Sequence, residues 1–257
     1  MKENLQVSLL QWDLSWHNAG KNRDKADSLL DANPGAELYI LPEMFTTGFT
    51  MQPDKVYETM EGPSVAWMKA RAKNLEAVLM GSLVIKDEDR YFNRVICALP
   101  SGELIHYDKR HLFSYAGEDK HYSPGKKQLH LELHGWKIKP LVCYDLRFPV
   151  WNRNTEEAHL MVFVANWPQR RSNAWNSLLK ARAIENQCYV AGVNRCGVDD
   201  NKIDYQGDTQ MIDYVGEVIA TLLDREGVAN IRLEAADLKN FRQRYPFLKD
   251  RDEFRIL

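Results

Sequence analysis

The sequence has little that would suggest a disulfide framework, a membrane span or a nucleic-acid surface. It contains only four cysteines, and none of them forms a C-x-x-C pair of the redox or zinc-binding kind. No stretch approaches the roughly 18 consecutive apolar residues of a membrane span. Lys plus Arg number 34 and Asp plus Glu number 36, so the net charge is only −2 and no basic face is indicated. We therefore expect a cytoplasmic protein without membrane or nucleic-acid partners.

Internal repeats, low-complexity segments and a glycine-rich phosphate loop are also missing from the sequence. The 257 residues are 44% hydrophobic, which is enough for a large core, and no linker divides them. We expect one domain over residues 1–257. The tail, about residues 235–257, is charged but keeps aromatic side chains such as Phe241 and Phe254. We expect this tail to pack on the body of the protein or on a second subunit.

Short apolar runs of strand length alternate with longer amphipathic stretches, a pattern typical of an α/β protein. About eleven strands against five helices favour two packed sheets over one, and tight turns near residues 87 and 100–102 indicate hairpins. The clearest helix has Ser172 as its expected N-cap. The predicted strands are 5–11, 38–41, 77–85, 93–99, 103–107, 136–143, 160–165, 188–194, 209–212, 218–222 and 228–233, and the predicted helices are 22–31, 64–76, 150–157, 172–186 and 236–244.

Three charged or nucleophilic residues each follow an apolar run, where a strand would end. Glu43 closes L-P-E, Lys109 lies in D-K-R-H-L-F, and Cys143 lies in L-V-C-Y-D-L-R-F-P. Each alone could be structural, and Cys97 and Cys188, inside apolar runs, are expected to be buried hydrophobic residues. Together the three supply a base, an oxyanion-stabilising cation and a soft nucleophile, which are the parts of acyl transfer through a thioester.

These three motifs, in this order, resemble those of the nitrilase superfamily, and the resemblance runs from Gln6 to about Leu233. Glu118, followed by S-P-G at 123–125, corresponds to a second glutamate of that superfamily, which is implied to position Lys109. The implied fold is a four-layer α-β-β-α sandwich of two mixed sheets flanked by helices. The implied assembly is a homodimer.

The residues around the cysteine point to one branch of the superfamily. C-Y-D-L-R-F-P, with N-W-P downstream, looks like the omega-amidase branch, which hydrolyses short dicarboxylic monoamides such as 2-oxoglutaramate and 2-oxosuccinamate. A second carboxylate on the substrate needs a cation, for which Arg147, Arg170 and Arg171 are candidates, although Arg170 and Arg171 are more ordinary as surface residues. The expected substrate-binding residues are Phe113, Arg147, Asn166, Trp167 and Arg170.

The resemblance also implies a mechanism that uses no metal and no organic cofactor. Glu43 would be the general base and Cys143 the nucleophile. Lys109 and, by analogy, the backbone N–H of Tyr144 would hold the oxyanion.

Three other functions are open at this point. The protein could be another amidase of the superfamily, acting on a carbamoyl amino acid or on deaminated glutathione. It could be a noncatalytic binding module, although no position of the triad is replaced. It could be a metal-dependent phosphoesterase that uses Asp145, Asn166, Asn194 and His159, but their spacing fits no ligand pattern.

Overall fold

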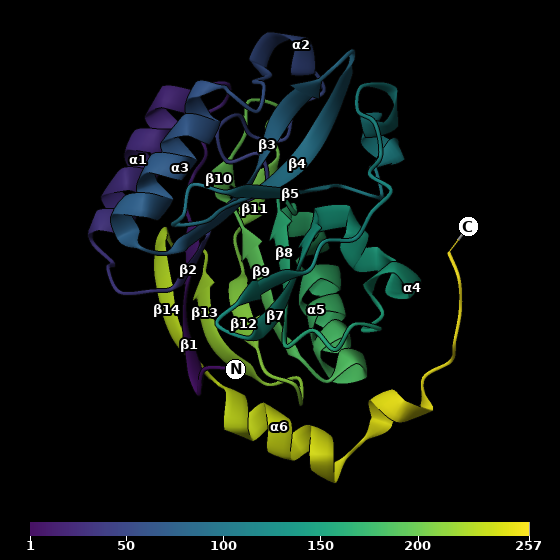
Figure 1. Cartoon of the computed structure of the whole chain (residues 1–257). Helices are drawn as coiled ribbons and strands as arrows, with labels where there is room; N and C mark the ends of the chain where they lie inside the picture. The colour runs from purple at the N-terminus through teal and green to yellow at the C-terminus, as the bar shows by residue number, and fades with distance from the viewer. Residues whose placement is uncertain (257) are drawn as a thin grey trace.

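Two six-stranded sheets face each other in the structure, a computed structural model in which residues 1–256 are described (Figure 1). A separate hairpin, β10 (Cys196–Val198) and β11 (Asp204–Gln206), lies outside both sheets. The first sheet runs in the order β14 (Gly227–Glu234), β1 (Asn4–Gln11), β2 (Leu38–Ile40), β3 (Val78–Asp87), β4 (Arg90–Ala98) and β5 (Leu104–Asp108). The second runs in the order β13 (Val218–Leu223), β12 (Thr209–Ile212), β9 (Tyr189–Asn194), β8 (Leu160–Ala165), β7 (Trp136–Val142) and β6 (Leu131–Leu133).

The two sheets have the same mixed pattern. In the first, β1, β2 and β3 are parallel, while β14 and β4 pair antiparallel on either side of them. In the second, β7, β8 and β9 are parallel, while β6 and β12 flank them antiparallel. The hairpin turns expected near residue 87 and at residues 100–102 are confirmed, since they join β3 to β4 and β4 to β5.

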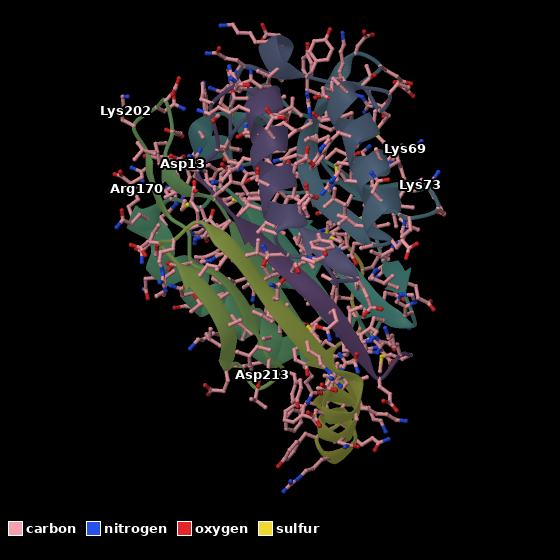
Figure 2. All side chains as sticks on the ribbon, turned by 90° about the vertical axis from the view of Figure 1, so that its left-hand side faces the viewer. Asp13, Lys69, Lys73, Arg170, Lys202 and Asp213 are labelled. Atoms are coloured by element: carbon pink, nitrogen blue, oxygen red, sulfur yellow. The ribbon has the colours of Figure 1, made fainter. Side chains whose placement is uncertain are left out.

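Helices cover the outer face of each sheet, which confirms the four-layer α-β-β-α sandwich. Helices α1 (Ala19–Asp31) and α3 (Pro63–Leu75) lie side by side over the first sheet, and α5 (Ser172–Asn186) covers the second (Figures 1 and 2). The short helices α2 (Pro53–Val56) and α4 (Pro149–Asn152) form single turns, and α6 (Ala235–Arg244) follows β14. No helix of residues 1–256 is long and apolar enough to cross a membrane.

The alternation of side chains along each strand produces this layering. Leu5, Val7 and Leu9 of β1 face the second sheet and belong to one large buried cluster with Trp136 of β7. Leu10, on the other face of β1, belongs to a second cluster with residues of α1 and α3. Because successive side chains of a strand point to opposite faces, a strand covered on both sides reads as a continuous apolar run.

The predicted helix over residues 150–157 is wrong, because α4 ends after one turn at Asn152. Asn154 is buried, and its side-chain Nδ2 donates to the carbonyl oxygens of Ala158 and Asn186 at 3.0 Å each. A buried asparagine that bonds to neighbouring backbone groups competes with the helical hydrogen bonds. The polar residues after Asn152 therefore anchor a loop.

Other boundaries also differ from the prediction. Helix α5 has the predicted bounds, but its N-cap is Arg171 and not Ser172, because a 3₁₀ turn over Gln169–Arg171 leads directly into the helix. Helix α1 begins at Ala19 and not at residue 22, since the side chain of Asn18 caps it by accepting from the Lys21 N–H. Strands β6, β10 and β11 and helix α2, each of three or four residues, were not predicted.

Cys97 and Cys188 are completely buried and free, as expected of small hydrophobic residues. Burial raises the pKa of each thiol to about 12, so both are inert at neutral pH.

The C-terminal segment contacts the second sheet and its loops. In α6, Arg242 donates to the carbonyl oxygens of Gln187 at 2.7 Å and Ala158 at 2.6 Å, and Leu238 is buried. Beyond the helix, Phe247 is 57% exposed and Phe254 is 45% exposed. Figure 1 shows α6 at the edge of the molecule, with the last residues extending away from it.

Lys139 of β7 is a buried lysine that is not bonded to a carboxylate among the described residues. Its Nζ donates to the carbonyl oxygens of Trp151 at 3.0 Å and Arg153 at 3.4 Å, at the end of α4. Burial lowers the pKa of Lys139 from its ordinary 10.5 to about 8. The folded state thus disfavours the charged form of this residue.

This depressed pKa predicts a stability that depends on pH. Between about pH 8 and 10.5 the unfolded chain keeps a proton on Lys139 that the folded chain has lost, so the free energy of unfolding rises with pH. Lys139→Met removes this titration. In urea unfolding, the free energy of unfolding of the wild type minus that of Lys139→Met should increase by up to about 3 kcal/mol from about pH 8 to 10.5. A difference that stays constant with pH would contradict the assignment, and exposed Lys202→Met serves as the control.

Candidate active site

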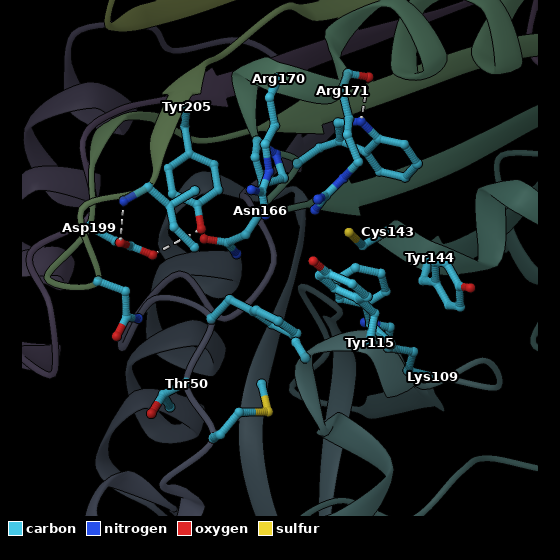
Figure 3. Close-up of a pocket in the computed structure, with 18 of the residues that line it drawn as sticks. Thr50, Lys109, Tyr115, Cys143, Tyr144, Asn166, Arg170, Arg171, Asp199 and Tyr205 are labelled. Carbon is cyan, nitrogen blue, oxygen red and sulfur yellow. Dashed lines mark hydrogen bonds between the residues drawn. The ribbon is translucent and has the colours of Figure 1, made fainter.

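The three residues predicted from the motifs lie at the carboxyl ends of strands in both sheets. Lys109 and Cys143 are the first residues after β5 and β7, and Glu43 follows β2 by three positions. Glu43 and Lys109 therefore come from the first sheet and Cys143 from the second, so the three meet where the two sheets face each other. Figure 3 shows the Cys143 sulfur at the wall of a cavity, with Lys109 near it.

Lys109 is clamped between two buried carboxylates. Its Nζ donates to Glu43 Oε1 at 3.0 Å and to Glu118 Oε1 and Oε2 at 3.0 and 2.9 Å, and all three side chains are at most 1% exposed. Burial lowers the pKa of Lys109, but Glu118 and Glu43 outweigh it and raise the pKa above its ordinary value. The lysine is therefore a fixed positive charge at neutral pH.

Glu118 is held by its other neighbours as well. Its Oε2 accepts from the Phe113 N–H at 2.6 Å. Burial, together with the nearby charge of Glu43, raises the pKa of Glu118, while Lys109 opposes this shift. The structure thus places Glu118 where it can orient the lysine.

The Glu43 carboxylate is fixed by donors on several sides. Its Oε1 accepts from Asn93 Nδ2 at 2.7 Å as well as from Lys109, and its Oε2 accepts from the Asn166 backbone N–H at 2.7 Å. Asn93 Oδ1 in turn accepts from Ser82 Oγ at 2.9 Å. Neither Asn93 nor Ser82 was predicted as part of the site. The available signal was a polar residue inside a largely apolar strand, in Y-F-N-R-V and in M-G-S-L-V.

Cys143 stands in a strained turn. Its φ of 42° lies in the left-handed region, which costs free energy for any residue except glycine, and a 3₁₀ turn over Cys143–Arg147 begins at this residue. Burial and the charge of Glu43 raise the pKa of the thiol well above its ordinary value, while Lys109 and the Asn166 N–H oppose the shift. The thiol is therefore neutral in the resting protein.

Asp145 connects the turn that begins at Cys143 to the residues on either side of Lys109. Its Oδ2 accepts from Tyr107 Oη at 2.7 Å and from the Val142 N–H at 3.1 Å, and its Oδ1 accepts from the His111 N–H at 2.9 Å. Tyr107 belongs to β5 and Val142 to β7. This buried carboxylate thus fixes the position of Cys143 relative to Lys109, and sequence reasoning missed that role.

The cavity beside Cys143 has a volume of about 350 Å³. The predicted residues on its wall are Lys109, Phe113, Cys143, Tyr144, Arg147, Asn166, Trp167 and Arg170. Arg171, for which a surface position was the more ordinary expectation, is half-buried on the same wall. Other segments, which no local motif marked, complete the wall with Trp16, Phe49, Met51, Tyr115, Asp199 and Tyr205.

The residues considered for a metal-dependent phosphoesterase do not gather at one place. His159 precedes β8 and Asn166 follows it, so they lie at opposite ends of the strand. Among residues 1–256, no group of three or more His, Cys, Asp and Glu side chains is placed to hold a metal ion.

Comparison with known proteins identifies the family. Residues 6–243 match the family model described as carbon-nitrogen hydrolase. The chain belongs to the carbon-nitrogen hydrolase family. This confirms the resemblance to the nitrilase superfamily.

Relatives of this carbon-nitrogen hydrolase match it over nearly its whole length. Omega-amidase YafV of Escherichia coli strain K12 is 43% identical over 98% of each chain. The 2-oxoglutaramate amidase of Bacillus subtilis strain 168 is 32% identical over 95% of this chain and 96% of its own. A solved structure of a carbon-nitrogen hydrolase superfamily protein from Xanthomonas campestris, with an arsenic adduct in its active site, has a TM-score of 0.97 and 44% identity, covering 99% of each chain.

The buried network around Glu43 predicts a stability cost for Asn93→Ala. The change removes a donor from Glu43 and an acceptor from Ser82, both completely buried. Since buried polar groups without partners are costly, urea unfolding should show a loss of about 2 to 4 kcal/mol. Exposed Asn240→Ala on α6 is the matched control and should change stability by less than about 0.5 kcal/mol. Equal effects of the two substitutions would show that the network contributes nothing.

Proposed function

We propose that this enzyme is an omega-amidase, which hydrolyses the terminal amide of short dicarboxylic monoamides, such as 2-oxoglutaramate and 2-oxosuccinamate, to the acid and ammonia. Its family and its identity with amidases over nearly the whole chain make it a hydrolase of linear amides. The relatives at 43% and 32% identity are named omega-amidase and 2-oxoglutaramate amidase, which supports this substrate class over carbamoyl amino acids and deaminated glutathione.

One observation carries the proposal. The thiol of Cys143 and the ammonium of Lys109 line one cavity, and Glu43 lies directly behind them, hydrogen-bonded to Lys109. The side chains of Arg147, Arg170 and Arg171 line the same cavity. The site therefore offers both the chemistry of thioester formation and positive charge for a substrate carboxylate.

In the first half of the reaction, Cys143 attacks the amide carbonyl carbon while Glu43 takes the thiol proton. Because the resting thiol is neutral, a base must remove this proton as the bond between sulfur and carbon forms. The Lys109 ammonium and the Tyr144 N–H would stabilise the oxyanion, and a donor of this kind contributes about 3 kcal/mol in the transition state.

In the second half, Glu43 gives its proton to the leaving nitrogen, the bond between carbon and nitrogen breaks, and ammonia departs from the thioester. Glu43 then takes a proton from a water molecule that attacks the thioester carbon. The bond between sulfur and carbon breaks, Glu43 returns its proton to the sulfur, the acid leaves, and the thiol of Cys143 is restored. Glu118 keeps Lys109 in place throughout, through its hydrogen bonds to Nζ.

We also propose that the protein is a single domain, lies in the cytoplasm and forms a homodimer. Residues 1–257 would act as one domain, because Leu5 of β1 and Trp136 of β7 share one buried cluster. The catalytic thiol must stay reduced, which favours the cytoplasm. The exposed apolar side chains of the C-terminal segment, Phe247 and Phe254, would be covered in a homodimer.

The thioester mechanism predicts that Cys143→Ala abolishes turnover while the protein stays folded. Cys188→Ala is the matched control, since it removes a buried thiol away from the site and should lower stability by roughly 1 to 3 kcal/mol without abolishing activity. Ammonia release and urea unfolding measure the two effects. Turnover by folded Cys143→Ala would end the mechanism.

The substrate assignment predicts discrimination by charge. Succinamate and butyramide differ in whether a carboxylate or a methyl group ends the chain. Because the arginines can pair with the carboxylate, kcat/KM for succinamate should exceed that for butyramide at least about a hundredfold, or about 2.7 kcal/mol. Equal rates on the two amides would overturn the dicarboxylate assignment and leave the thioester chemistry untouched.

The dimer predicts that the intact protein sediments as twice its chain mass at micromolar concentration. Deleting the residues from Phe247 onward should weaken that association, because it removes exposed apolar side chains that a partner would bury. Exposed Lys69→Ala on α3, pointing outward in Figure 2, should leave the association unchanged. A stable monomer of the intact chain would rule the dimer out.

A further inference from the structure

The cavity contains an excess of positive charge that the protein itself does not neutralise. Besides Lys109, its wall includes Arg147, Arg170 and Arg171. None of these arginines is within 4.0 Å of a carboxylate oxygen among the described residues, in contrast to Arg94 and Arg182, which are paired. The acid on the wall, Asp199, accepts instead from Tyr205 Oη and from the Ile203 N–H, both at 3.0 Å.

The three arginines differ in burial, although Arg147 also stacks on an aromatic ring, with its guanidinium carbon 4.9 Å from the centre of the Trp167 ring. The side chains of Arg147 and Arg170 are exposed, whereas Arg171 is half-buried. The Arg171 guanidinium carbon lies 5.1 Å from the centre of the Phe113 ring, and the carbonyl oxygen of Arg171 accepts from Trp167 Nε1 at 2.9 Å. The backbone of Arg171 is thus held by Trp167, and its guanidinium packs on Phe113.

The stack on Phe113 places Arg171 next to the catalytic groups. The Phe113 N–H donates to Glu118, and the Phe113 ring packs edge-on against Tyr144 with ring centroids 5.0 Å apart. Figure 3 shows the Arg171 side chain directed toward the sulfur of Cys143. Because Arg171 and Cys143 line the same cavity, a substrate amide bound at the sulfur would extend its far end toward this guanidinium.

The charge and the partial burial of Arg171 both favour the binding of an anion by its guanidinium. Burial, followed by the charges of Arg170, lowers the pKa of Arg171, while Cys143 acts in the opposite direction. A partly desolvated cation without a partner gains more from a bound carboxylate than an exposed one does. The planar guanidinium can also bind a carboxylate through two parallel hydrogen bonds.

We propose that Arg171 is the specificity-determining residue of this enzyme: its guanidinium binds the carboxylate at the far end of the substrate, while Arg147 and Arg170 add only long-range attraction. The assignment rests on the proposed omega-amidase function. It deepens that function by naming the group that would select a dicarboxylic monoamide over a neutral amide.

The test is the ratio of kcat/KM for succinamate to kcat/KM for butyramide, measured for the wild type and for Arg171→Met, Arg147→Met and Arg170→Met. Met keeps the length and apolar character of the arginine stem and removes the charge. The ratio should fall at least about thirtyfold in Arg171→Met and by less than about tenfold in each of the other two variants. Exposed Arg90→Met, far from the cavity, is the control for charge alone and should leave the ratio unchanged.

A second variant separates recognition from loss of structure. Arg171→Glu reverses the charge, so it should raise the preference for 4-aminobutanamide over butyramide at least about tenfold relative to the wild type. A damaged fold lowers the rates on both amides together and leaves the ratios near their wild-type values.

The outcomes distinguish the two proposals. A wild-type succinamate to butyramide ratio near one overturns the omega-amidase function, and the role of Arg171 with it. A large wild-type ratio that survives in Arg171→Met, or that falls instead in Arg147→Met or Arg170→Met, overturns the assignment of Arg171 alone.

Discussion

The site depends on one buried interaction, the clamp of Lys109 between Glu43 and Glu118. Removing three charges from water is costly, and their mutual attraction compensates for this only when the geometry is good and the remaining oxygens are hydrogen-bonded. In this site the carboxylate oxygens are hydrogen-bonded, because Asn93, the Asn166 N–H and the Phe113 N–H donate to them. The donors that stabilise the charges also fix the carboxylate that acts as the proposed base.

The sandwich makes this arrangement possible. Glu43 and Lys109 follow strands of the first sheet, whereas Cys143 and Asn166 follow strands of the second. Packing two mixed sheets face to face brings four strand ends together, and the buried cluster shared by the sheets holds them in register. Asp145 then fixes the ends of β5 and β7 directly to each other through Tyr107 and Val142.

The sequence was sufficient to predict the layers, because apolar runs mark strands. It also marked Glu43, Lys109 and Cys143 as the proposed reacting groups, because each lies within one short motif. It was insufficient for the network around them. Asn93, Ser82 and Asp145 act through partners 11 to 50 positions away, and no local pattern encodes such pairings. The helix predicted over 150–157 failed for the same reason, since Asn154 is held by Asn186, 32 residues away.

The burial of the Cys143 thiol beside Glu43 also bears on how readily its sulfur oxidises. Peroxides and alkylating agents attack thiolates, and the resting Cys143 is kept as a thiol by its surroundings. In the proposed mechanism, the sulfur loses its proton only when an acyl group is present to receive it. The proposed nucleophile would therefore spend the time between turnovers as a thiol, the form of cysteine that oxidises more slowly than the thiolate.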